Sequence, residues 1–97
     1  MPEAELLRPA VSIVTATYNR GRWLECAVRS IVRQTFTDWE LVVVGDACTD
    51  DTADVVARFD DARIRFINLT RNFGEQAGPN NVGVAESRAP LIAFLNH

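Results

Sequence analysis

Four short runs of mostly apolar, often β-branched residues recur along the chain, separated by segments with helical spacing. The runs are VSIVT at 11–15, ELVVV at 40–44, RIRFIN at 63–68 and LIAFL at 91–95. Runs of this length and composition are typical of β-strands. ELVVV and LIAFL are almost continuously apolar, which predicts strands covered on both faces.

Helical spacing predicts three helices between these strands. In the first, an apolar stripe lies at the i, i+1, i+4, i+5 spacing of one helix face and comprises Trp23, Leu24, Ala27, Val28, Ile31 and Val32. The second helix is predicted to start near Thr52, with Val55, Val56 and Phe59 facing inward. Its capping candidates are Thr49, Asp50 and Asp51.

The third predicted helix begins after Gly78 and ends at about Ser87. Pro79 falls in its first turn, where a missing N–H costs little. Strands and helices therefore alternate along the chain, which predicts a doubly wound α/β fold: a mainly parallel, Rossmann-like sheet of about four strands with helices on both faces. Residues 1–10 carry no period and contain two prolines, so we expect a lead-in there and one domain over 11–97.

Length and charge narrow the function classes. The chain has 97 residues, 47% of them hydrophobic, which suffices for one small core. A net charge of -3 with interspersed signs argues against nucleic acid as a partner. No apolar run approaches the roughly 20 residues of a membrane span, and the N-terminus lacks the layout of a signal peptide. We therefore expect a soluble, cytoplasmic protein.

Cysteine and histidine, the residues typical of zinc sites, are sparse. Cys26 and Cys48 are the only cysteines, and they form neither a disulfide framework nor a CxxC zinc pattern. We expect both to have a structural or incidental role. His97 is the only histidine and has no partner at metal-ligand spacing.

Polar and small residues follow each predicted strand. Residues 16–20 follow the first, 45–50 the second, 70–74 the third, and Asn96 with His97 the fourth. Open α/β sheets bind ligands outside the carboxyl ends of their strands, at the point where the winding reverses. The joint placement of these residues predicts a binding site at that edge of the sheet.

Two residues at this edge are the strongest candidates for ligand contact. Asp46 directly follows an apolar strand and could accept hydrogen bonds from a base or ribose; the alternative is an N-cap or Asx-turn carboxylate. The ring of Tyr18 could stack on a nucleobase or complete the core. For Trp23 and Trp39 we expect packing in the core or between helix and sheet.

Familiar phosphate-binding motifs are missing from the sequence. Neither GxGxxG nor GxxxxGK[ST] occurs, so a dinucleotide cradle of the NAD type and a P-loop are excluded. The first strand is not followed by the acidic pair of a phosphorylation receiver domain. If the ligand carries phosphates, another arrangement must hold them.

Four segments in fixed order closely resemble the N-terminal half of family 2 glycosyltransferases with the GT-A fold. They are VSIVTATYNR, SIVRQTFTDWELVVVGDACTDDT, NFGEQAGPNNVG and APLIAFLNH, and together they cover nearly everything after residue 10. The resemblance implies a parallel sheet that binds a nucleoside diphosphate sugar, with UDP, GDP or dTDP as the nucleotide, at the edge identified above.

The resemblance also implies roles for individual residues. Tyr18 would lie against the nucleobase, Asp46 would hydrogen-bond it, and the turn at Ala16 and Thr17 would line the pocket. The segment from Gln76 to Asn81 would approach the diphosphate or the sugar. Asn96 stands where the first residue of the acidic metal-binding motif commonly sits, so we expect Mg²⁺ or Mn²⁺ to bind just after His97 and not within this chain.

Several positions depart from the family pattern. Ala16 replaces a frequent proline, Gly45 a usual carboxylate and Cys48 a common serine. These changes leave nucleotide binding intact as a prediction but do not identify the base. Together with Asn96, Gly45 supports an alternative, a non-catalytic module for binding nucleotides or proteins. A third alternative is a purely structural α/β fragment.

Family members usually transfer the sugar with inversion, when an acceptor hydroxyl attacks the anomeric carbon and the nucleoside diphosphate leaves. A metal stabilises the leaving group, and a carboxylate from the second half of the domain removes the proton. Because this chain carries neither group, we expect it to be inactive alone. In the family the fourth strand is internal, so a chain ending at His97 is expected to self-associate through an uncovered edge.

Overall fold

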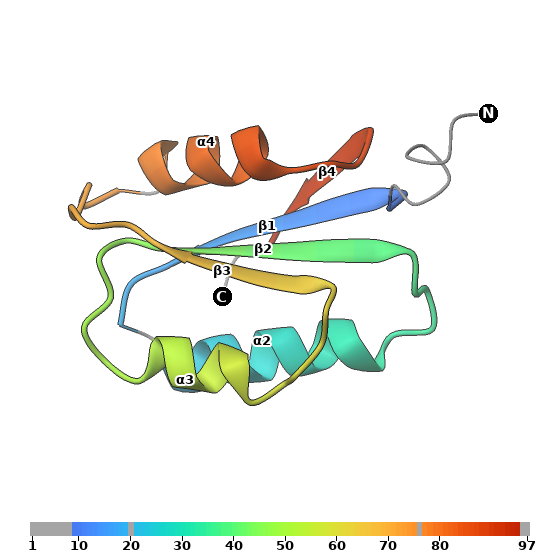
Figure 1. Cartoon of the computed structure of the whole chain (residues 1–97), viewed down its shortest axis with the longest axis horizontal. Coiled ribbons are helices and arrows are strands. Elements are labelled where there is room, and N and C mark those ends of the chain that lie inside the picture. The colour runs from blue at the N-terminus through green and yellow to red at the C-terminus, as the bar shows by residue number, and fades with distance from the viewer. Residues whose placement is uncertain (1–8, 20, 76, 96–97) are drawn as a thin grey trace.

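The computed structural model describes residues 9–19, 21–75 and 77–95, and it contains the seven predicted elements in the predicted order. The elements are β1 (Val11–Thr17), α2 (Gly21–Arg33), β2 (Trp39–Gly45), α3 (Thr52–Ala57), β3 (Ile64–Asn68), α4 (Ala77–Glu86) and β4 (Leu91–Phe94) (Figure 1). The predicted lead-in lies almost entirely outside the described residues.

The four strands form one parallel sheet in the order β3-β2-β1-β4. Val14 in β1 is flanked by Val42 on one side and Phe94 on the other. The chain adds β2 and β3 on one side of β1 and then returns to place β4 on the other. The winding therefore reverses at β1, which confirms the doubly wound arrangement.

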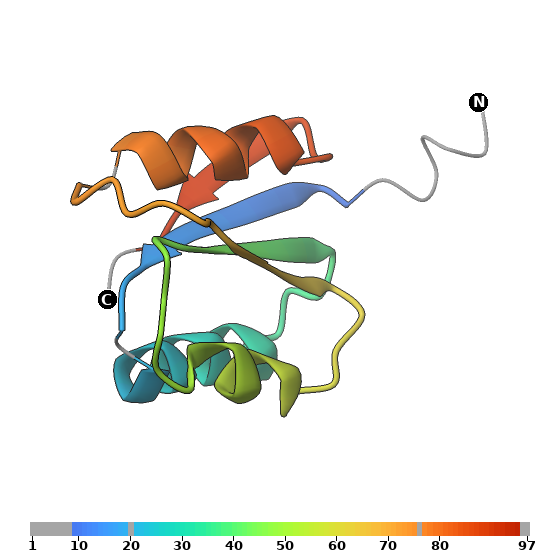
Figure 2. The same cartoon turned by 60° about the vertical axis from the view of Figure 1, so that its left-hand side comes forward.

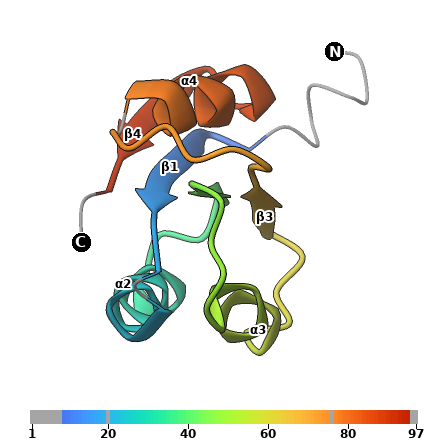
Figure 3. The ribbon, with the colours of Figure 1, turned by 90° about the vertical axis from the view of Figure 1, so that its left-hand side faces the viewer.

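Helices cover both faces of the sheet. Figures 1 and 3 show α2 and α3 side by side on one face and α4 alone on the other, and Figure 2 shows the same three layers after a turn of 60°. This layering explains the burial of β2, all seven residues of which are buried. None of the described helices is long and apolar enough to cross a membrane.

The main core lies between the sheet and α2. Leu24, Val28 and Ile31 recur at the i, i+4, i+7 spacing of one helix face and pack against Leu41 and Val43 of β2. On the opposite face, a Cβ atom at Gly83 of α4 would collide with the Val14 side chain, so α4 packs closely on β1 because residue 83 is glycine.

The two tryptophans have opposite environments. Trp39 at the start of β2 is 2% exposed, and the guanidinium of Arg63 lies 3.9 Å from the centroid of its ring. Trp23 in α2 is 64% exposed, so the prediction that it packs in the core was wrong. The buried face of α2 is centred on Leu24, and Trp23 is turned about 100° away from it.

The prediction that LIAFL is covered on both faces was also wrong. Leu91 is 64% exposed and Phe94 57% exposed, and all four residues of β4 are exposed. Within the described sheet β4 is an edge strand that pairs with β1 alone. The continuous apolar run therefore predicted the strand correctly but not the exposure of its side chains.

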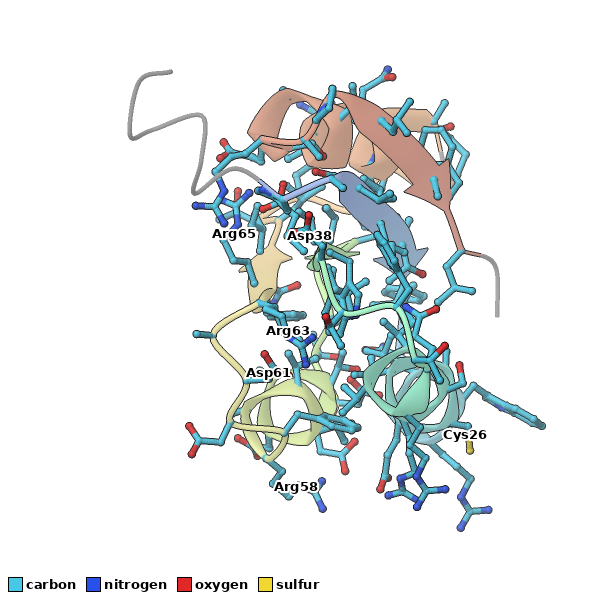
Figure 4. All side chains as sticks on the ribbon, turned by 90° about the vertical axis from the view of Figure 1, so that its right-hand side faces the viewer. Cys26, Asp38, Arg58, Asp61, Arg63 and Arg65 are labelled. Atoms are coloured by element: carbon cyan, nitrogen blue, oxygen red, sulfur yellow. The ribbon has the colours of Figure 1, made fainter. Side chains whose placement is uncertain are left out.

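A buried carboxylate organises the amino edge of the sheet, opposite the candidate site. Glu40 accepts hydrogen bonds from the Ser12 hydroxyl at 2.5 Å and from the backbone N–H of Arg88 at 2.6 Å. The guanidinium groups of Arg88 and Arg65 lie 3.1 and 3.6 Å from it. Figure 4 views this edge, where Arg65 and the ion pair of Arg63 with Asp61 are labelled. Glu40 thus ties the connection between α4 and β4 to β1 and β2.

Candidate functional site

The carboxyl ends of β1, β2 and β3 meet at one edge of the sheet, which we call the carboxyl edge. Figure 3 looks onto this edge and shows the chain leaving β1 and β2 toward α2 and α3, and leaving β3 toward α4. The described loop residues 18–19, 46–51 and 69–75 follow these strands. The polar residues predicted to form a site are therefore brought together by the parallel order of the strands.

Thr17 and Asp46 join the first two loops. The backbone N–H of Asp46 donates to the carbonyl of Thr17 at 2.8 Å, which extends the ladder one step beyond the strands. Ala16 and Thr17 are the last residues of β1 rather than a turn, which corrects that prediction. Thr17 is buried, and its hydroxyl has no hydrogen-bond partner among the described residues. An unpaired buried hydroxyl is costly, and it is a candidate for contact with a ligand.

The Asp46 carboxylate holds the loop that precedes α4. It accepts hydrogen bonds from the backbone N–H groups of Phe73, at 2.7 Å, and Gly74, at 3.0 Å. The Asp46 residue is only 5% exposed. Its partners lie 27 and 28 residues away, so this carboxylate is neither an N-cap nor an Asx turn. Sequence reasoning singled out Asp46 but did not anticipate this contact.

Tyr18 presents its ring at the surface. The residue is 50% exposed and directly follows Thr17 at the end of β1. The ring therefore does not complete the core. A half-exposed aromatic ring offers a flat apolar surface for stacking, and this one directly follows Thr17, whose carbonyl accepts the Asp46 N–H.

Asn19 holds the loop after β2 from the side of β1. Its Oδ1 accepts the N–H of Thr49 at 2.9 Å and of Asp50 at 3.2 Å, and its Nδ2 lies 3.4 Å from the Thr49 hydroxyl. Asn19 has a φ of 48°, in the left-handed region that Asn tolerates better than most residues. The sequence placed Asn19 in a loop but gave no signal for its partners.

Asn68 holds the same loop from the side of β3. Its Oδ1 accepts the N–H of Cys48 at 2.8 Å, and its Nδ2 donates to the Cys48 carbonyl at 3.0 Å. The Cys48 thiol in turn lies 3.5 Å from the Thr17 carbonyl. Nothing in the sequence pattern distinguished Asn68 from the other residues of the third strand, because its role depends on the pairing of β3 with β2.

Asp50 fixes the start of α3. Its carboxylate accepts the hydroxyl and the N–H of Thr52, and it reaches the N–H of Gly21 at the start of α2. The Thr52 hydroxyl is the main reason that the pKa of Asp50 is held below its usual value, and the two backbone N–H groups add to the effect. Of the three capping candidates, Asp50 bonds the first N–H of the helix, whereas Asp51, which stands at the N-cap position, makes no side-chain capping bond.

The other residues predicted to contact the ligand do not join the group of Thr17, Tyr18 and Asp46 or lie outside the described residues. Asn81 lies on α4 with an exposed side chain, and it forms no hydrogen bond with the described residues Thr17, Tyr18 or Asp46. Gln76, Asn96 and His97 lie outside the described residues. The first N–H groups of α4 are taken by Glu75, whose carboxylate accepts from Ala77 at 2.5 Å and from Gly78 at 2.9 Å.

No metal site is formed by the residues that the structure describes, which contain no group of three or more His, Cys, Asp and Glu side chains that could hold an ion. Two carboxylates of the carboxyl edge are engaged in bonds within the protein. Asp46 binds backbone N–H groups, and Asp50 caps a helix.

Comparison with known proteins decides the family. The family model described as "Glycosyl transferase family 2" matches residues 12–97. The chain belongs to this family. Within glycosyl transferase family 2, validoxylamine A glucosyltransferase of Streptomyces hygroscopicus is 38% identical over 100 residues, which cover 99% of this chain and 24% of that protein.

Solved glycosyltransferase structures share the fold. S. aureus TarS 1-349 in complex with UDP-GlcNAc superimposes with a TM-score of 0.84 at 26% identity, over 89% of this chain and 26% of that one. The mannosyltransferase PcManGT of Pyrobaculum calidifontis, in complex with GDP-Man and Mn²⁺, gives a TM-score of 0.72 at 27% identity, over 82% and 25% of the two chains. The family member described here spans between 22% and 36% of the length of the first curated relatives that it matches.

Proposed function

We propose that this chain supplies the nucleotide-binding part of an enzyme that transfers a sugar from a nucleoside diphosphate sugar to an acceptor hydroxyl. The observation that carries the proposal is the grouping at the carboxyl edge. The half-exposed ring of Tyr18 follows Thr17, whose hydroxyl has no partner among the described residues and whose carbonyl is bonded to Asp46. The ring would stack on the base, and the hydroxyl and carboxylate would hydrogen-bond it.

The present contacts of Asp46 are compatible with this role. Each carboxylate oxygen can accept two hydrogen bonds, and each oxygen of Asp46 accepts one from the loop, Oδ1 from Phe73 and Oδ2 from Gly74. One acceptor position on each oxygen is left for an N–H of the base. The low exposure of Asp46 would make such a bond strong, because water competes little there.

The diphosphate is assigned to the neighbourhood of α4. The N–H groups of Ala77 and Gly78 are already bonded to the Glu75 carboxylate, so contact with the diphosphate would fall to side chains near α4 and not to these backbone groups. We propose that residues 76–81, Gln76 and Asn81 included, approach the diphosphate or the sugar. We also propose that the whole protein requires Mg²⁺ or Mn²⁺ held by residues beyond the described ones, Asn96 marking the start of that region. PcManGT carries Mn²⁺ in its complex with GDP-Man.

The donor class follows from the same comparison. UDP-GlcNAc, UDP and GDP-Man are the ligands named for the structural neighbours, which supports a nucleoside diphosphate sugar and leaves UDP, GDP and dTDP as the nucleotides to test. The proposed reaction proceeds with inversion. The catalytic base and the acceptor site are assigned to other parts of the protein, so this chain is expected to bind nucleotide without turnover.

Titration calorimetry with UDP, GDP and dTDP, each with and without Mn²⁺, tests the proposal. We expect one nucleotide to bind, and Asp46→Asn to weaken binding about tenfold, the effect of losing one hydrogen bond to a charged group. Asp54→Asn is the matched control, because Asp54 is an exposed carboxylate on α3 and should leave affinity unchanged. Absence of heat with every nucleotide would instead indicate a structural or protein-binding module.

A further inference from the structure

We propose that Asn68 is a positioning residue for the nucleotide, and that Gly45 is required because it admits the Asn68 side chain. The inference rests on the proposed function and deepens it, since it concerns how Asp46 is held in place. Gly45 ends β2, Asn68 ends β3, and the two are direct partners in the parallel ladder. Neither residue is a proposed ligand contact.

The space above Gly45 is already filled. A Cβ atom at position 45 would lie 2.7 Å from the Asn68 Oδ1, 3.0 Å from the ring of Phe66 and 3.1 Å from the Cys48 thiol. The first of these distances is shorter than a normal contact of a Cβ atom, so the Asn68 Oδ1, which accepts the Cys48 N–H, would have to move. Family members usually carry a carboxylate at position 45. Here the Asn68 amide occupies the space that such a side chain would need, so the glycine at 45 and the asparagine at 68 depend on each other.

The Asn68 amide uses both of its ends on one residue of the loop. Its Oδ1 and Nδ2 bond the N–H and the carbonyl of Cys48, at 2.8 and 3.0 Å. A planar amide that makes two hydrogen bonds to one peptide segment fixes both the position and the orientation of that segment. Any substitution that removes one end also leaves a loop backbone group without its partner.

The held segment lies next to Asp46 and needs outside support. Ala47, between Asp46 and Cys48, has a φ of 60°, a left-handed conformation that alanine adopts reluctantly. Such a residue persists only where its surroundings determine it. Asn68 supplies the bonds on one side of it and the Thr17 carbonyl accepts the Asp46 N–H on the other. Loosening Cys48 would let Ala47 relax and would displace the Asp46 carboxylate.

Nucleotide affinity of Asn68→Ala in the full chain tests the inference. We expect the Kd for the nucleotide that binds the unchanged protein to rise roughly tenfold, and amide hydrogen exchange of Cys48 to accelerate while exchange in β2 is unchanged. Asn68→Asp should also weaken binding, because a carboxylate oxygen would face the Cys48 carbonyl. Arg63→Ala is the matched control: it removes an ion pair at the other end of β3 and should lower stability without changing Kd.

The link to Gly45 is tested by a double-mutant cycle. Gly45→Ala should weaken binding in the unchanged protein but much less in Asn68→Ala, because the colliding amide is then gone. If the unchanged chain bound nucleotide and Asn68→Ala bound it equally well, this inference alone would fail. If the unchanged chain bound no nucleotide, the proposed function would fail and the inference with it.

Discussion

The backbone N–H of Phe73 donates to the Asp46 carboxylate at 2.7 Å and so joins the end of β2 to the loop before α4. The residue proposed to recognise the base is thus also the residue that fixes the approach to α4. Binding of the base at Asp46 would therefore be coupled to the loop before α4. That loop leads to the residues that we propose approach the diphosphate or the sugar. Replacing Asp46 therefore tests both the recognition of the base and the support of the loop before α4.

Replacing Asp46 by asparagine should loosen the loop before α4. One carboxylate oxygen becomes an NH₂ group, which cannot accept from Phe73 or Gly74, and we expect a loss of about 1–3 kcal/mol in the free energy of unfolding. Hydrogen exchange should accelerate at the amide of Phe73 or Gly74. Unchanged exchange at both amides, with Asp54→Asn as the reference, would show that the contact has little energetic weight.

Stability should fall in acid, with Glu40 as a principal cause. Burial alone would raise the pKa of Glu40, but hydrogen bonds from Ser12 and Arg88 outweigh it and hold the pKa below its ordinary value. The pKa values of Asp50 and Asp61 are lowered as well. Because these groups bind protons more readily when the chain is unfolded, their contribution is present above the ordinary pKa, about 4, and is lost as pH falls through the lower folded value.

Urea unfolding at a series of pH values measures this effect. The free energy of unfolding should decrease below about pH 4, and the decrease should be shallower in Glu40→Gln, which cannot titrate. Glu25→Gln, which removes a partly exposed carboxylate on α2 that pairs with Arg29, is the control. Equal slopes in all three proteins would mean that the Glu40 network contributes nothing to the acid sensitivity.

The two tryptophans should differ sharply in their effect on stability. Trp39→Ala removes a buried ring and the surface on which Arg63 stacks, so we expect a loss of about 3–5 kcal/mol. Trp23→Ala, at an exposed position of α2, should change stability by less than about 0.5 kcal/mol. Chemical denaturation of the two variants side by side checks this; a large effect of Trp23→Ala would imply that its ring is covered in solution.

Self-association through β4 stays a prediction, and the exposure of Leu91 and Phe94 gives it a concrete form. An edge strand with exposed apolar side chains favours pairing with another copy. Phe94→Lys should lower the association seen in sedimentation velocity, whereas Phe36→Lys, at another exposed aromatic, should not. A monomer at high concentration in the unchanged protein would refute the prediction.

The alternation of apolar runs and helical stripes was enough to predict the seven elements. The spacing of apolar residues reflects the packing of each element in a sheet covered on both faces. The same signal could not tell a central strand from an edge strand: LIAFL is as apolar as ELVVV, yet β4 is exposed and β2 buried. Nor could it tell Trp23 from Leu24, which differ only in their angle around one helix.

The site was predictable as a location but not as a set of contacts. Parallel strand order alone brings Tyr18 and Asp46 to one edge. The bonds of Asn19 and Asn68 to the loop after β2 depend on strand pairing and on left-handed residues such as Ala47, none of which local sequence spacing reveals. The departure at Gly45 was visible in the sequence, and its reason became clear only with Asn68 in place.

The most direct test of nucleotide binding at the carboxyl edge is a map of amide chemical shifts as UDP, GDP or dTDP is added to the ¹⁵N-labelled chain. We predict that shifts concentrate at Thr17, Tyr18 and Asp46 and in the loop of Phe73 and Gly74, while the amino edge around Glu40 is unaffected. Shifts that were absent with every nucleotide, or centred away from the carboxyl edge, would contradict the account.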